Sequence, residues 1–363
     1  MKRILTAVMI MVASGTTVWA GNPDRRGEAG AWELNINGWA RSTGLWGMNA
    51  SRIRGLEAER VNVAGLAFVR GSEIGFSYSQ WLWGSGVGVI QGGFAQSIKQ
   101  VNVLAISVQS LNFGTMYRTT TDVPEGIGTF KPSFLNIGVS FARDFGTGIY
   151  GGITVRLVNE SIENISATGV AIDAGLQYVT GPKDNIHFGV AIRNVGTPMR
   201  FRGDGLNERV AFSNDGYQTT FDRRSNKFEL PTQFMISASY DFLFGKRLEV
   251  SPGVYKQNFR ITPNAQFTSN AFGSDHYFAG LEFSYRELFQ LRGGYRFEEG
   301  IFKSSTRINA FTGPSAGTSF QIPLSKTNTT TLGIDYSFRA SQPFIGTHTF
   351  GMRLNIGTKK KEG

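Results

Sequence analysis

Few residues in this 363-residue chain have types and spacing that suggest reactive chemistry. There is no Cys, which excludes disulfides and thiolate metal sites. His187, His276 and His348 have no second His or carboxylate at the sequence spacing of a metal or catalytic site. Neither a Gly-x-Ser-x-Gly elbow nor a Walker loop occurs. We therefore expect no enzyme activity, no metal and no cofactor.

Charged residues of both signs instead alternate with apolar ones in several segments. Two interpretations stay open: opposite charges pair across neighbouring strands and hold an internal segment, or they line a lumen that conducts or binds polar or anionic material. The candidate inner-face residues are Asp173, Arg193, Asp241, Glu282, Arg286, Arg292, Arg296, Glu298, Asp335, Arg339 and Arg353.

The elements that position these charges have the two-residue period of β-strands. In 135–142 the odd positions carry Leu, Ile, Val and Phe, and the even positions carry Asn, Gly, Ser and Ala. The same alternation runs through 170–178, 186–193, 277–286, 289–298, 332–339 and 350–356. A transmembrane barrel needs this pattern because one face of each strand meets lipid, but a soluble sandwich also produces it.

The N-terminus favours the membrane interpretation. Lys2 and Arg3, an apolar stretch and Val18-Trp19-Ala20 have the layout of a secretory signal peptide over 1–20. No other segment has 18 consecutive apolar residues, so an exported membrane protein must cross as a barrel. Removing Lys2 and Arg3 lowers the net charge from +10 to +8. Export makes lipopolysaccharide a better partner for this charge than nucleic acid.

Strand number and connections also favour a barrel. Short connections at 144–148, 244–246 and 287 alternate with long ones at 195–229 and 258–275, as expected for periplasmic turns and external loops. Aromatic residues at strand ends, including Trp81 and Trp83, suit interfacial girdles. We predict an all-β, integral outer-membrane β-barrel of about 14 antiparallel strands over 61–357, followed by a basic tail at 358–363.

Residues 21–60 lack the alternation and carry three Trp residues, with a short helix expected at 52–60. We interpret this segment as a hatch inside the barrel, because a lumen of this size would otherwise stay open. The alternative is an unstructured periplasmic leader, which three Trp residues argue against.

Several motifs, in order, resemble those of the PorV/PorQ family, FadL-like barrels of the type IX secretion system in Bacteroidota. Residues 38–47 (GWARSTGLWG) resemble its "GARATAMGG" entry and 62–67 (NVAGLA) its "NPAGLA". Residues 76–82, 169–178, 194–196 and 229–232 complete the set. Val63 stands where the family has Pro, and Val61 where it has Trp, so a divergent paralogue is also compatible.

The resemblance implies a non-enzymatic secretion component in the outer membrane, which binds translocon or attachment-complex proteins, or the C-terminal signal domain of secreted cargo, through extracellular loops. The alternative is a FadL-like transporter of hydrophobic solutes; an acyl hydrolase lacks a nucleophile and base pair. The loop at 198–229 carries the Arg and aromatic residues expected to contact a protein partner. These are Arg200, Phe201, Arg202, Arg209, Phe212, Tyr217, Phe221, Arg223 and Arg224. Lipopolysaccharide contact is the other possible role of this loop.

Overall fold

The computed structural model describes residues 21–212, 217–251, 254–324 and 330–357. The expected signal peptide (1–20) and basic tail (358–363) lie outside the described residues. No helix in the described ranges is long and apolar enough to cross a membrane.

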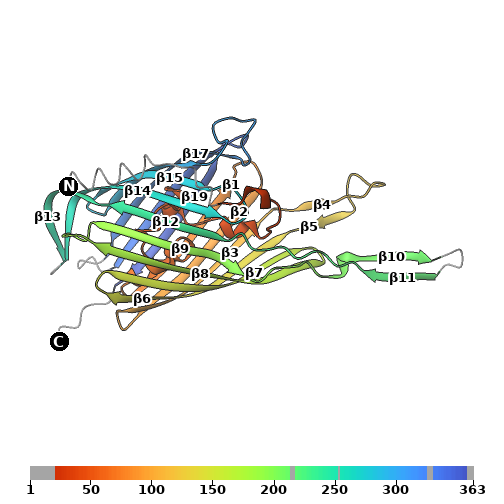
Figure 1. Cartoon of the computed structure of the whole chain (residues 1–363), viewed down its shortest axis with the longest axis horizontal. Coiled ribbons are helices and arrows are strands. Elements are labelled where there is room, and N and C mark those ends of the chain that lie inside the picture. Colours follow the sequence, from red (N-terminus) through yellow and green to blue (C-terminus); the bar gives the residue numbers. More distant parts are fainter. Residues whose placement is uncertain (1–20, 213–216, 252–253, 325–329, 358–363) are drawn as a thin grey trace.

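The described chain forms a closed antiparallel barrel (Figure 1). Its strands are β1 (Ser72–Trp81), β2 (Val87–Ile98), β3 (Asn102–Asn112), β6 (Ser133–Gly146), β7 (Ile149–Ile162), β8 (Ile165–Thr180), β9 (Ile186–Gly196), β12 (Gln233–Tyr240), β13 (Phe242–Ser251), β14 (Val254–Asn270), β15 (His276–Tyr285), β16 (Phe289–Phe297), β17 (Phe311–Pro323), β18 (Thr330–Ser341) and β19 (Thr347–Ile356).

The predicted count of 14 strands is confirmed. β12 and β13 pair with successive parts of β14, from Gln233 opposite Asn270 to Phe242 opposite Ile261, so together they form one strand of the wall. The remaining neighbours pair in sequence order around the wall, and β1 closes on β19 with Ser72 opposite Ile356. The outer face is exposed and apolar, as in Val139 and Leu176.

The two ends of the barrel differ in the length of the connections between strands. The ribbons β4–β5 (Met116–Arg118, Gly128–Phe130) and β10–β11 (Asn207–Phe212, Tyr217–Asp222) extend from one end, which we assign as extracellular because long loops lie outside in such barrels (Figure 1). The predicted long loop at 258–275 is wrong, because most of it belongs to β14. That strand was missed because Pro263 and Ala265 weaken its apolar face.

The N-terminal segment fills the barrel, and its inner boundary lies later than predicted. Residues 29–71, here called the plug, contain η2 (Trp32–Asn35), α2 (Ala40–Thr43), η3 (Leu56–Arg60) and η4 (Val63–Phe68), preceded by η1 (Pro23–Arg25). η4 is almost fully buried, and the first strand begins at Ser72 rather than at residue 61. The apolar core therefore lies inside the barrel, where plug residues pack on Ala95, Ala105 and Ala142 of the wall.

Small wall residues make room for the plug. A Cβ on Gly175 would lie 2.1 Å from the side-chain oxygen of Asn62, and one on Gly189 would lie 2.5 Å from the carbonyl oxygen of Ala50. Asn62 caps η4 by accepting from the Ala64 N–H (3.2 Å) and donates to the Ala50 carbonyl (2.9 Å). The NVAGLA motif thus forms the contact between the plug and the wall.

Candidate functional site

Buried ion pairs join the plug to the wall in three places. In the first, Arg156 of β7 lies between Glu59 of the plug (Nη2 to Oε2, 3.0 Å) and Asp173 of β8 (Nη2 to Oδ2, 2.9 Å). All three side chains are at most 4% exposed. Gln91 of β2 also donates to Glu59 (2.9 Å). One wall guanidinium therefore pairs with one plug carboxylate and one wall carboxylate, which gives each of these buried anions a partner.

The second group surrounds Arg52 of the plug. Its guanidinium lies 2.9 Å from Asp241 Oδ1 and 3.4 Å from Glu282 Oε1. Glu282 also pairs with Arg260 of β14 (2.8 Å) and with Arg292 of β16. This network crosses four strands of the wall and includes one plug residue.

The third group joins α2 and η3 to the last two strands. Arg353 of β19 pairs with Asp335 of β18 (2.7 Å) and with Glu57 of the plug (3.5 Å). Glu57 also pairs with Arg41 of the plug (3.3 Å). Beside this group the hydroxyl groups of Thr43 and Ser337 are 2.7 Å apart.

Ten of the eleven candidate inner-face residues predicted from the sequence have buried side chains. They are Asp173, Arg193, Asp241, Glu282, Arg292, Arg296, Glu298, Asp335, Arg339 and Arg353. Arg286 is the exception and a correction: it lies in the exposed turn after β15, with φ of 53°, and donates to Asn258 (3.1 Å). The alternation ends one residue earlier, because β15 ends at Tyr285.

A cavity of about 480 Å³, here called the vestibule, lies between the plug and the extracellular loops. Its aromatic lining residues are Trp32, Trp46, Trp81, Phe272, Phe278 and Phe311. Its charged lining residues are Arg26, Arg60, Arg193, Arg296, Arg339 and Glu298, in addition to His276. Trp81 therefore faces the lumen, and its predicted place in an interfacial girdle is wrong. It packs edge-on against Phe311 with ring centroids 5.4 Å apart.

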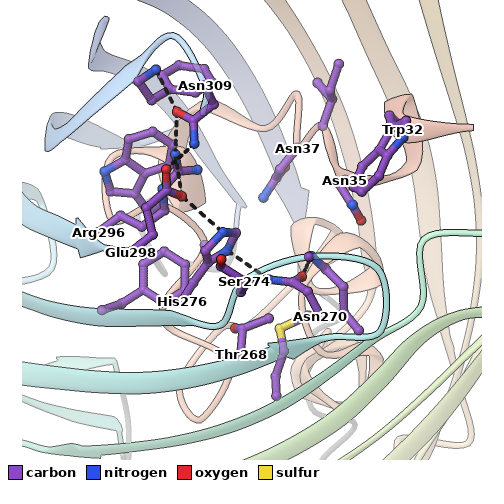
Figure 2. A pocket seen from close by; sticks show the side chains of 18 of the residues that line it. Trp32, Asn35, Asn37, Thr268, Asn270, Ser274, His276, Arg296, Glu298 and Asn309 are labelled. Carbon is purple, nitrogen blue, oxygen red and sulfur yellow. Dashed lines mark hydrogen bonds and ion pairs between the residues drawn. The ribbon is translucent and has the colours of Figure 1, made fainter. Parts of the chain in front are cut away.

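Figure 2 shows the polar side of the vestibule. Glu298 Oε2 lies 3.1 Å from His276 Nε2 and 3.3 Å from Arg296 Nη2, and Arg296 also donates to Asn309 (3.0 Å). Below it, Asn270 donates to the Ser274 carbonyl (2.6 Å). These residues come from β14, β15, β16 and their extracellular connections. The sequence did not pair His276 with Glu298, because they are distant along the chain and only strand register brings them together.

The other His with a carboxylate partner lies below the vestibule, where His187 Nε2 is 3.2 Å from Asp241 Oδ2. No group of three His, Cys, Asp or Glu side chains within the described ranges could hold a metal ion.

A carboxyl pair lies at the extracellular end of the plug. Glu33 of η2 is 3% exposed, and burial together with the neighbouring carboxylate of Glu160 raises the pKa of Glu33 to about 8. A proton on Glu33 lets the two acids lie side by side without mutual repulsion.

The loop residues predicted to contact a partner lie in different environments. Phe201 is half-buried against Phe228 (centroids 5.7 Å apart) and packs on the plug cluster, so it is part of the loop's own support. Arg202, Phe221 and Arg224 are exposed, Arg200 is half-buried, and Arg223 pairs weakly with Glu208 (3.5 Å). Phe212 and Tyr217 face each other in the β10–β11 register, and their side chains lie outside the described part.

Sequence reasoning missed the plug side of this site. It named many wall charges, but not Arg156 and Arg260. It also did not name Arg41, Arg52, Glu57 and Glu59, which supply the plug's half of the ion pairs. One signal was available: the segment 52–60 (RIRGLEAER) carries three Arg and two Glu, and its other residues are apolar or small. Which wall residue each one meets depends on barrel register.

No protein-family model matches the chain, and no curated protein sequence matches it. Solved structures do. The toluene transporter TbuX of Ralstonia pickettii is 11% identical, with a TM-score of 0.51 over 88% of this chain and 98% of that chain. The toluene transporter TodX of Pseudomonas putida is 12% identical, with a TM-score of 0.50 over 92% and 98%. The CymD monoaromatic hydrocarbon channel is 11% identical, with a TM-score of 0.50 over 86% and 95%.

At these identities the likeness shows the fold alone. The described chain is a FadL-like, 14-strand antiparallel barrel of the bacterial outer membrane with an N-terminal segment before the barrel.

Proposed function

We propose that this protein admits small hydrophobic solutes to the outer membrane and binds them in the vestibule. The observation that carries the proposal is the cavity itself: about 480 Å³, with six aromatic lining residues and a few convergent polar groups. Such a cavity has the size and lining of a small-molecule site. Proteins of similar fold that are described as toluene transporters and a monoaromatic hydrocarbon channel support the same class of solute.

Passage beyond the vestibule requires the plug to move. Below the cavity the lumen is filled by plug residues and by the three groups of ion pairs. Buried pairs oppose an open, continuous tunnel, so a solute must displace part of the plug or leave sideways through the wall. Transport should therefore depend on the freedom of α2 to leave β18.

A disulfide can test this dependence because the chain has no Cys. In the Thr43→Cys/Ser337→Cys variant, oxidation would join α2 to β18 where the native hydroxyl groups are 2.7 Å apart. Entry of N-phenylnaphthylamine into intact cells, followed by its fluorescence, should fall to the level of cells without the protein and recover with reductant. Thr43→Cys alone is the matched control. Dye entry that does not depend on the protein would refute the proposal.

The second candidate is a component of the type IX secretion system that binds a translocon protein or secreted cargo. The specific observation is the β10–β11 ribbon, which extends beyond the barrel with Arg202, Phe221 and Arg224 exposed nearby (Figure 1). Exposed Arg and aromatic side chains suit a protein contact. A lumen closed by ion pairs fits this candidate, since binding at the surface needs no passage.

Affinity capture from outer membranes tests the second candidate. The native protein should recover a secretion-translocon component or cargo carrying the C-terminal signal domain. A variant with 204–222 replaced by a short Gly-Ser linker should lose it, and the oxidised Thr43→Cys/Ser337→Cys variant should keep it. If the native protein recovers neither kind of partner, this candidate is wrong. The two functions thus respond oppositely to the same pair of variants.

A further inference from the structure

The charge of the vestibule is strongly one-sided. Five arginines and one glutamate line it, giving a formal excess of four positive charges (5 − 1) if His276 is neutral. The ion-pair groups deeper in the lumen are different, because there the guanidinium groups of Arg156, Arg260 and Arg353 each have a carboxylate oxygen within 3.0 Å. The unbalanced arginines are thus concentrated where a cavity exists.

Arg339 is the clearest case. It lies near the extracellular end of β18 and is 5% exposed. Its Nε and one Nη are buried without an acceptor in the described part of the chain. The guanidinium carbon instead lies over three rings, 4.9 Å from the centroid of Trp81, 5.4 Å from Phe311 and 5.5 Å from Trp46.

Ring faces attract this cation but accept no strong N–H hydrogen bonds. Cation–π contacts offset part of the cost of burying this charge, but they do not replace the hydrogen bonds that its N–H groups lose when they leave water. Arg296 does not compensate the charge of Arg339, because it is a second cation beside the same Trp46 ring (4.5 Å). It also has Glu298 as its own partner. Arg339 therefore needs an anion that the described part of the chain does not supply.

Two further arginines of the vestibule also have a buried nitrogen without an acceptor in the described residues. Arg60 Nη1 and Arg193 Nε are buried without an acceptor in the described ranges, and both residues line the vestibule. Their other nitrogens are used: Arg60 donates to Gln109 (2.9 Å), and Arg193 donates to the Leu34 carbonyl (3.0 Å). The plug side of the cavity is thus also electropositive.

We propose that the vestibule selects aromatic carboxylates, with the carboxylate on Arg339 and the ring against Trp46, Trp81 and Phe311. This inference rests on the proposed solute-binding function and narrows it to one chemical class. A planar carboxylate matches the fork of a guanidinium, and a charged hydrogen bond in a dry site contributes more than a neutral one. A flat aryl group matches walls made of aromatic faces and edges. Neutral hydrocarbons would leave Arg339 without its anion.

The test compares two ligands of nearly equal shape. Binding of 2-naphthoate and of neutral 2-naphthamide is measured by calorimetry on the intact protein in a non-ionic detergent. The wild type should bind the carboxylate at least about tenfold more tightly, as expected for a charge-assisted pair. In Arg339→Gln the preference should disappear, whereas in Arg286→Gln, which changes an exposed arginine in a turn away from the vestibule, it should remain.

Each result decides something. Equal binding of both ligands by the wild type would overturn the inference while leaving the solute-binding function intact. Binding of neither ligand would overturn both. Because the wild-type comparison needs no variant, a failure of Arg339→Gln to fold would not remove the test. That variant is itself expected to be at least as heat-stable as the wild type, since it removes an unpaired buried charge.

Discussion

Arg156 offers the strongest test of how the plug is held. In Arg156→Met the side chain keeps its approximate volume but loses its charge. Glu59 and Asp173, both at most 4% exposed, then lose the guanidinium group that lies between them. Breaking a buried pair by removing one partner costs about 3–5 kcal/mol. That is roughly two to three and a half orders of magnitude in the unfolding equilibrium constant.

The magnitude has an internal check. The variant Arg156→Met/Glu59→Gln/Asp173→Asn removes all three charges, and replacing a buried ion group with neutral residues is often close to neutral in stability. It should therefore recover most of the loss. An external control is Arg223→Met, whose pair with Glu208 is 3.5 Å long and lies on the surface. Its cost should stay below about 1 kcal/mol.

Two assays separate the plug from the wall. Urea unfolding in detergent micelles, followed by the shift in gel mobility of heated and unheated samples, reports the barrel. Limited proteolysis of folded protein reports whether residues 29–71 become accessible. We expect accessibility of the plug to rise at lower urea than barrel unfolding. If Arg156→Met costs less than about 1 kcal/mol by both assays, water screens the lumen and the ion pairs do not hold the plug.

Three further predictions concern the packing, the membrane face and pH. Gly175→Val should displace Asn62 and expose the plug to protease, because a Cβ there would lie 2.1 Å from the Asn62 oxygen; unchanged protection would contradict this fit. Val139→Arg, on the 56%-exposed outer face near the middle of β6, should cost about 2–4 kcal/mol in lipid bilayers and much less in soft micelles, measured by urea unfolding; equal costs would argue against lipid contact. Because the pKa of Glu33 is raised to about 8, the folded state keeps a proton that the unfolded chain releases above about 4.5. Stability should therefore fall as pH rises from about 4.5 to about 8, and change little with this group above that. In Glu33→Gln the urea midpoint of unfolding should depend less on pH over this range. If its pH dependence matches that of the wild type, another group causes the loss of stability.

The alternation of residue types was enough to predict the barrel and its strand number, because lipid imposes a strict rule on every second side chain. It failed where the rule is weak. In β14 the outward positions include Pro263 and Ala265 between Ile261 and Phe267, and Pro is disfavoured inside a strand, so the apolar face is interrupted in the middle of the strand. The boundary at residue 61 failed for a different reason. η4 is short, apolar and buried, and its composition does not distinguish a plug segment from a strand.

The partners inside the lumen could not be predicted, because pairing depends on register across strands that are distant in sequence. Arg156 and Asp173 are brought together by the β7–β8 ladder, in which Thr154 is opposite Asp173. His276 and Glu298 meet through the β15–β16 pair. A sequence gives the parity of each strand, and therefore which side chains face inward. It does not give the stagger that selects one inward carboxylate rather than another.

The distribution of arginines divides the lumen into two parts with different demands. Deep in the barrel, Arg156, Arg260 and Arg353 each pair with carboxylates of the plug or the wall, so any solute reaching them would have to compete with a partner already at hydrogen-bonding distance. In the vestibule, Arg339 has rings on its faces and unused donors at its edge. A protein selected only for rigidity gains nothing from an unpaired buried cation, since replacement by a neutral residue would raise its stability. Retaining the arginine makes physical sense when an anion arrives from outside, and the extracellular end of the barrel is where one would arrive.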